Sequence, residues 1–124
     1  MRLKLIAVAA LALLAAGCAT PPPPEPGSSA SKVVAMGKLK NIVVGSMRVA
    51  RENGFKTVNV QLSNTSYSNQ TFYYRFAWIG AEGFPVGGEE VWKSQLMYGE
   101  QVSFIQAIAP TAQAVDFRLE IKTP

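Results

Sequence analysis

The chain has no histidine and a single cysteine, Cys18, among its 124 residues. Without histidine it lacks the commonest general base, the commonest metal ligand and any Ser-His or Cys-His nucleophile. One cysteine cannot close a disulfide within the chain, so a packed core has to stabilise the fold. These absences predict no catalytic residue, no cofactor and no bound metal, and they make an enzyme the least favoured function.

Acidic side chains are also scarce, and Asp116 is the only aspartate. Glu89 and Glu90 are adjacent, but neighbours on a strand point to opposite faces of a sheet. A glycoside-hydrolysing pair needs two carboxyl groups that face each other across a groove. Glu82 and Glu100 would form such a pair only if the fold brought them together, so the sequence predicts no active site.

No apolar run is long enough to cross a membrane. The run at residues 5–16 follows the basic residues Arg2 and Lys4 and falls short of the ~20 residues that a transmembrane helix needs. Its length suits the apolar region of a secretory signal, which is typically about 7–15 residues long. We therefore predict that residues 1–17 are a signal peptide.

The segment Leu14-Ala15-Ala16-Gly17-Cys18 resembles the lipobox of bacterial lipoproteins. In that class the cysteine is acylated and becomes the first residue of the mature chain, and two or more acyl chains give a stable anchor. The resemblance implies lipid attachment at Cys18. Alanine rather than aspartate at position 19 implies the periplasmic leaflet of the outer membrane. The alternative is an ordinary secretory signal that leaves Cys18 as a free thiol.

Residues 18–32 combine prolines, serines and a glycine with almost nothing apolar to bury. Proline fixes φ and lacks an N–H, so prolines 21–24 predict a stiff polyproline II rod of about 3 Å per residue. We interpret the segment as a tether between the lipid and a single domain at residues 33–124. A proline ligand for an aromatic groove is the alternative.

Residues 33–124 alternate in hydrophobicity, are divided by turn signals and show no helical period. Asn53-Gly54 is a strong signal for a tight hairpin. About seven strands predict an all-β fold, an antiparallel β-sandwich of immunoglobulin or fibronectin type III kind. The strands are expected at residues 39–51, 57–63, 71–79, 84–86, 91–98, 102–109 and 114–122.

The aromatic side chains divide between a core and a surface. Strand alternation places Trp78 in the core, and we expect Trp92 to cap the same core. Tyr73 points to the opposite face, while Tyr67 and Phe84 fall in loops. Because exposed tyrosine and phenylalanine anchor protein partners or stack on sugar rings, these three residues are the candidate partner surface.

The chain has 12 basic and 8 acidic residues, and the excess is concentrated in residues 38–56. Only one acidic residue, Glu52, accompanies the basic side chains of this segment, which are Lys38, Lys40, Arg48, Arg51 and Lys56. Beside a lipid anchor they would suit contact with anionic headgroups or the cell wall. The favoured interpretation is that they keep an edge strand soluble. Nucleic acid is not expected as a partner in the periplasm.

Several residues of the globular region stand in a characteristic order: Val60-x-Leu62-x-Asn64, Tyr74-Arg75-Phe76-x-Trp78, Gly83, Trp92, Ala109-Pro110 and Phe117-Arg118-Leu119. This order resembles the YcfL-like family of small lipoproteins from Gram-negative bacteria. The resemblance implies a lipoprotein β-sandwich. It implies no particular activity, because none is established for the family.

Together these features predict a non-enzymatic accessory lipoprotein of the periplasmic cell envelope. Its domain is expected to contact another envelope protein, either through the Tyr67/Tyr73/Phe84 surface or through an open sheet edge. The alternative is a module that binds peptidoglycan or another carbohydrate through the aromatic residues and the basic edge.

Overall fold

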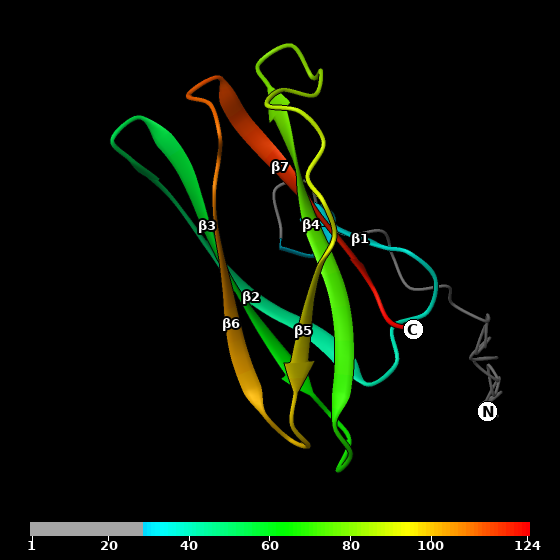
Figure 1. Ribbon diagram of the computed structural model, residues 1–124. Helices are drawn as coiled ribbons and strands as arrows, with labels where there is room; N and C mark the ends of the chain where they lie inside the picture. Colours follow the sequence, from blue (N-terminus) through cyan, green and yellow to red (C-terminus); the bar gives the residue numbers. More distant parts are fainter. Residues whose placement is uncertain (1–28) are drawn as a thin grey trace, which may run out of the picture.

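The computed structural model describes residues 29–124, in which a short 3₁₀ helix precedes seven strands. These elements are η1 (Ser29–Lys32), β1 (Val33–Ala35), β2 (Ile42–Glu52), β3 (Phe55–Asn64), β4 (Gln70–Gly80), β5 (Lys93–Met97), β6 (Val102–Ile108) and β7 (Ala114–Lys122). One sheet has the order β1-β7-β4-β5 and the other the order β2-β3-β6. The two sheets face each other (Figure 1), so the predicted all-β sandwich is confirmed.

The strand order differs from that of an immunoglobulin domain, in which the second strand shares a sheet with the first, fourth and fifth. Here β2 pairs with β3, and β7 lies between β1 and β4. The pairing of β1 with β7 is parallel, and the other pairings are antiparallel. Asn53 and Gly54, at the β2–β3 turn, both have positive φ, as the predicted hairpin requires.

Inward-pointing side chains of both sheets form the core, because alternate residues of a strand face the same way. Its largest members come from β4 and β7, and the rings of Phe76 and Trp78 stack with centroids 5.5 Å apart. Phe117 lies against both rings. The burial of Trp78, at 1% exposure, confirms the sequence prediction.

A short helix lies directly before the predicted domain at residues 33–124. Ser29–Lys32 form η1, and Nζ of Lys32 lies 2.8 Å from Oδ1 of Asp116. β1 then pairs with β7, but its three residues are too few to produce a recognisable strand pattern. The predicted signal peptide, Cys18 and the proline rod lie outside the described residues. Among residues 29–124, no helix is both long and apolar enough to span a bilayer.

The sandwich has two ends, where the loops lie, and two flanks, formed by the edge strands. At the top of Figure 1 the β4–β5 loop lies near the β6–β7 turn, and at the bottom the β3–β4 loop meets the β5–β6 turn. We call the side formed by η1, β1 and β2 the near flank, because the described chain begins there. The opposite side, formed by β5 and β6, is the far flank, where Gln95 donates a hydrogen bond to Ser103.

Candidate functional site

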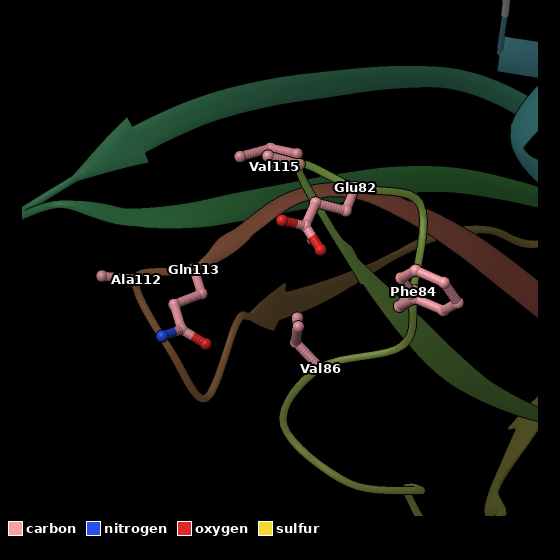
Figure 2. A pocket seen from close by; sticks show the side chains of 8 residues that line it. Glu82, Phe84, Val86, Ala112, Gln113 and Val115 are labelled. Atoms are coloured by element: carbon pink, nitrogen blue, oxygen red, sulfur yellow. The ribbon is translucent and has the colours of Figure 1, made fainter.

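An open pocket of about 480 Å³ lies where the β4–β5 loop meets the β6–β7 turn. Figure 2 shows Phe84, Val86 and Val115 around it, with Glu82 and Gln113 as its polar side chains. Phe84 is 68% exposed. We call this the loop-end pocket. Its apolar lining with a single carboxylate suits an apolar side chain of another molecule.

Backbone hydrogen bonds fix the loop that carries Phe84. Gly80 N donates to the carbonyl oxygen of Phe84 at 2.8 Å, and Val86 N donates to that of Trp78 at 3.0 Å. Gly83 has φ +85°, which favours glycine at this turn. The predicted strand at residues 84–86 is reduced to a single bridge between β4 and this loop. Phe84 is therefore presented by an ordered loop.

The structure does not bring Tyr67, Tyr73 and Phe84 together. Tyr67 lies in the loop before β4 and Phe84 in the loop after it, so the 11 residues of β4 separate them. At about 3.3 Å per residue, this strand places the two loops on the order of 30 Å apart. Tyr73 lies on β4 itself, near the Tyr67 end. The three residues thus belong to different sites, and only Phe84 borders the loop-end pocket.

The loop that carries Tyr67 contacts the β5–β6 turn, which begins at Tyr98, a residue not predicted as part of a site. The two residues are 89% and 61% exposed. A Cβ atom at Gly99 would overlap the carbonyl group of Tyr67, so the two loops touch through their backbones. Glu100 N also donates to the carbonyl oxygen of Ser66 at 2.8 Å. We call Tyr67 and Tyr98 the tyrosine pair.

Asn64 holds the loops of the tyrosine pair together from inside and is 2% exposed. Its Nδ2 donates to the carbonyl oxygens of Ser68 at 2.8 Å and Tyr98 at 3.0 Å. Its Oδ1 accepts from the backbone N–H of Ser66 at 3.0 Å and from that residue's hydroxyl at 2.9 Å. Such a satisfied buried amide fixes the backbone around it.

Trp92 does not cap the core, and the prediction was wrong on this point. Its ring centre lies 4.4 Å from Cζ of Arg75 and 4.1 Å from Nζ of Lys122, on the outer side of the four-stranded sheet. Lys122 also lies 6.0 Å from the ring of Tyr73. β5 begins only at Lys93, so strand alternation does not apply to Trp92. We call Tyr73, Arg75, Trp92 and Lys122 the aromatic–cationic cluster.

The aromatic–cationic cluster is already engaged with its own neighbours. Arg75 binds Glu120 at 2.9 Å and Glu89 at 2.7 Å. The hydrogen bond to Glu120 is the main cause that raises the pKa of Arg75. Two cations lie against the Trp92 ring, so a ligand would have to displace one of them. This cluster is therefore a weaker binding candidate than the exposed aromatic residues at the two ends.

Glu90 accepts hydrogen bonds from donors at the exposed edge of β4. β5 pairs with β4 only as far as Tyr74, which leaves the next backbone groups open. The Glu90 carboxylate accepts from the backbone N–H of Phe76 at 3.1 Å and from Nε1 of Trp78 at 2.9 Å. Burial raises the pKa of Tyr74, and the charge of Glu90 raises it further.

The remaining acidic side chains do not form the pair that glycoside hydrolysis would need. Glu82 lies at the loop-end pocket, and Glu100 lies in the β5–β6 turn at the opposite end of the sandwich. Glu89 is mostly exposed and is paired with Arg75. In residues 29–124, no three acidic or thiol side chains are grouped as metal ligands would be.

The basic residues of segment 38–56 are spread over β2, the chain before it and the start of β3. β2 is an edge strand, as the sequence analysis expected. Arg51, near its end, donates to the carbonyl oxygens of Gly54 and Ala114 at 2.6 and 3.2 Å. Lys40 lies at the opposite end of β2, where its N–H donates to Thr123. This distribution favours protection of an edge over a single anion-binding patch.

Asp116 attaches η1 to the four-stranded sheet. Burial by itself would raise the pKa of Asp116, but hydrogen bonds from Lys32, from the backbone N–H of Phe117 and from Arg118 lower it to about 2. The two ion-pair distances are 2.8 Å to Lys32 and 3.0 Å to Arg118. The only aspartate of the chain is therefore used for structure.

The site and fold together define a small β-sandwich with aromatic side chains exposed at both ends. The chain belongs to the family described as "Protein of unknown function (DUF1425)", whose profile matches residues 31–123. No curated protein matches it significantly.

Two crystal structures resemble the domain. Campylobacter jejuni cj0090 has a TM-score of 0.66 and 24% identity, over 75% of this chain and 98% of that one. A DUF1425 family member from Shewanella sp. pv-4 has a TM-score of 0.62 and 28% identity, over 67% of this chain and 78% of that one. The first likeness concerns the fold alone, and the second agrees with the family assignment.

Proposed function

We propose that this chain is a non-enzymatic, YcfL-like lipoprotein, anchored through Cys18 in the periplasmic leaflet of the outer membrane. Its domain acts as an accessory module that binds another envelope protein. The signal-like residues 1–17, the lipobox-like segment and the proline tether support the anchor. The observation that carries the binding role is Phe84, 68% exposed at the rim of an apolar pocket.

The loop-end pocket favours a protein partner on chemical grounds. Burying a side chain such as Phe84 contributes roughly 1.5–3 kcal/mol, and the neighbouring valines extend the apolar area. Glu82 lies at the same pocket and suits a basic group of the partner. The partner segment that fits is therefore an apolar side chain with a lysine or arginine nearby.

Site-specific photocrosslinking in living cells tests the protein partner. A photoreactive residue replaces Phe84 in one variant and Tyr67 in the other, so that the two ends of the same fold are compared. We expect one discrete protein adduct from position 84 and none at that mass from position 67. Adding Glu82→Lys to the position-84 variant should reduce the adduct. Identical patterns from both ends, or no adduct from position 84, would refute the pocket as the binding site.

Mass spectrometry of the purified chain tests the anchor. We expect the chain to begin at Cys18 and to carry acyl chains, and we expect Cys18→Ser to leave the membrane fraction. An unmodified thiol, or membrane retention of the serine variant, would contradict the anchor. Neither result would affect the pocket, which is tested separately.

The tyrosine pair supports a second candidate, a module that binds peptidoglycan. Two exposed aromatic rings on rigidly connected loops suit stacking against sugar rings. Sedimentation with purified sacculi separates the two candidates. If peptidoglycan is the ligand, the chain should sediment with the sacculi, and Tyr67→Ala with Tyr98→Ala should abolish this while Phe84→Ala retains it. A chain that stays in the supernatant would exclude this candidate.

A further inference from the structure

The edge strands of the sandwich differ in their protection against pairing with another chain. An edge strand exposes unpaired N–H and C=O groups, which proteins shield by charge, irregular register or short length. Within the described residues, β1 has only three residues, and β5 carries Lys93. β2 carries Arg48 and Arg51 and has an irregular register. β6 has seven residues, a regular register with β3 and no charge.

The free edge of β6 exposes the backbone groups of alternate residues. Ala109 N donates to the carbonyl oxygen of Lys56 at 2.8 Å, so the odd-numbered residues of this register bond to β3. The even-numbered residues point their N–H and C=O groups away from β3, and no other strand of the described chain pairs with them. These residues are Val102, Phe104, Gln106 and Ile108.

The side chains along this edge are apolar and exposed. Val102, Phe104 and Ile108 are 49%, 68% and 60% exposed on the outer face of the three-stranded sheet. Asn59 lies opposite Gln106 in the register and adds no charge to this face. A seven-residue strand with unpaired backbone groups and exposed apolar side chains is a template for an additional strand.

We propose that β6 pairs with β6 of a second copy of this chain, in antiparallel orientation about a two-fold axis at Ile105. In this register Phe104 lies opposite Gln106 of the second copy, and Val102 lies opposite Ile108. Both members of each pair are even-numbered, so their free N–H and C=O groups bond to each other. The two three-stranded sheets become one continuous sheet of six strands.

The absence of charge favours a second copy as the occupant. About a two-fold axis at Ile105, residues 104 and 106 lie diagonally opposite their own copies, so a charge at either position would come close to the like charge of the second copy, which destabilises the pair. β6 carries no charge at these or its other positions, whereas β2 carries two arginines and a glutamate. A different partner would tolerate charge on this strand and would favour it for complementarity.

The chain that precedes the described domain does not fit this edge. It joins η1 at Ser29, on the near flank, whereas β6 lies on the far flank. Residues 21–24 and 26 are proline, which has no N–H to donate to a neighbouring strand. In dimers through β6, Ser29 of each copy therefore lies outside the interface. This self-association is independent of the partner proposed for the loop-end pocket.

Disulfide trapping of the full chain in cells tests the register. Phe104→Cys combined with Gln106→Cys places thiols opposite each other across the proposed axis. Arg48→Cys combined with Ala50→Cys is the matched control, with the same spacing on the outer face of the other edge strand. We expect a disulfide-linked dimer from the β6 variant, and only the level of the unmodified chain from the β2 variant. No dimer from β6, equal dimer from both, or a disulfide to a different protein would overturn the proposal.

Sedimentation of the full chain in mild detergent provides a test without cysteine. We expect a concentration-dependent dimer. Gln106→Lys should raise the dissociation constant of this dimer by about tenfold or more, which corresponds to ≥1.4 kcal/mol. Asn59→Lys adds the same charge one strand inward and should change dimerisation less. Circular dichroism verifies that both variants are folded. An unmodified chain that is monomeric at every concentration, or equal weakening by both lysines, would overturn the proposal.

Discussion

The two flanks of the sandwich are held by different interactions and are protected to different degrees. On the near flank, η1 is attached by the partly exposed ion pair of Lys32 and Asp116, and the edge strands are short or charged. On the far flank, the β5–β6 turn is attached by the buried amide of Asn64 and by close backbone contact at Gly99. The far flank is therefore held by buried hydrogen bonds and close packing, and its edge strand β6 carries no charge.

This difference predicts that the two flanks respond differently to pH and salt. Partly exposed ion pairs contribute little and depend on pH and salt, whereas buried hydrogen bonds and tight packing do not. The near flank, where η1 is attached by an ion pair, should be the more sensitive to both. The flank that presents β6 and Tyr98 keeps its shape. Four substitutions test this contrast.

Gly99→Ala should have the largest effect. A Cβ atom there would overlap the carbonyl oxygen of Tyr67, so the β5–β6 turn would have to move away from the β3–β4 loop. Overpacking against backbone should cost about 3 kcal/mol of unfolding free energy, measured by urea denaturation. Gly88→Ala is the control: its Cβ meets nothing, and only the positive φ costs about 1 kcal/mol. Equal losses would contradict a tight contact at Gly99.

Asn64→Ala should have the second-largest effect and lower the unfolding free energy by about 2 kcal/mol. The backbone groups that this amide satisfies would be left buried without partners. The loss should be the same at low and high salt. Asn59→Ala, on the outer face of the same strand, should change the unfolding free energy by no more than about 0.5 kcal/mol. Salt dependence of the Asn64→Ala loss would contradict the role assigned to this residue.

Glu90→Gln should lower the unfolding free energy by about 1 kcal/mol. An amide can accept from either the Trp78 indole or the Phe76 N–H, but its NH₂ group then faces the other donor. Thermal unfolding followed by tryptophan fluorescence measures the loss. Glu89→Gln affects only an exposed carboxylate and should be nearly neutral. If the two variants are equally stable, Glu90 does not support the edge of β4.

Lys32→Met should have the smallest effect of the four, and this effect should depend on pH. The pKa of Asp116 is lowered from 3.8 to about 2 in the folded state, so the stabilisation is present above pH 3.8 and is lost as pH falls through about 2. We expect Lys32→Met to lower the unfolding free energy by at most about 1 kcal/mol at pH 7 and to have almost no effect at about pH 1, well below the folded-state pKa. Lys38→Met is the control. A loss that stays constant with pH would contradict this ion pair.

Much of the fold was predictable from local patterns. Alternation in β3, β4 and β7 predicted their buried faces, and Asn53-Gly54 predicted the hairpin, because both depend on neighbouring residues alone. β1 was missed because three residues carry no period. Trp92 was misplaced because the strand pattern was extended past the first residue of β5.

The candidate sites were less predictable. The exposure of Tyr67 and Phe84 followed from their positions in loops, but their separation followed from the direction and length of β4. Tyr98 was not recognised, because an aromatic residue at the end of a strand has the same local pattern whether it is buried or exposed. Its neighbour Tyr67 is 31 positions away in the chain.

The amino-acid sequence by itself determined that this chain makes strands, that its core needs no disulfide, and that histidine-based chemistry is excluded. Each of these depends on residue identity or on a period of two along one segment. The tertiary structure alone decided which loops share an end, which cations lie against Trp92, and that β6 is left as an uncharged edge. These depend on strand order, and many strand orders bury the same alternating side chains equally well.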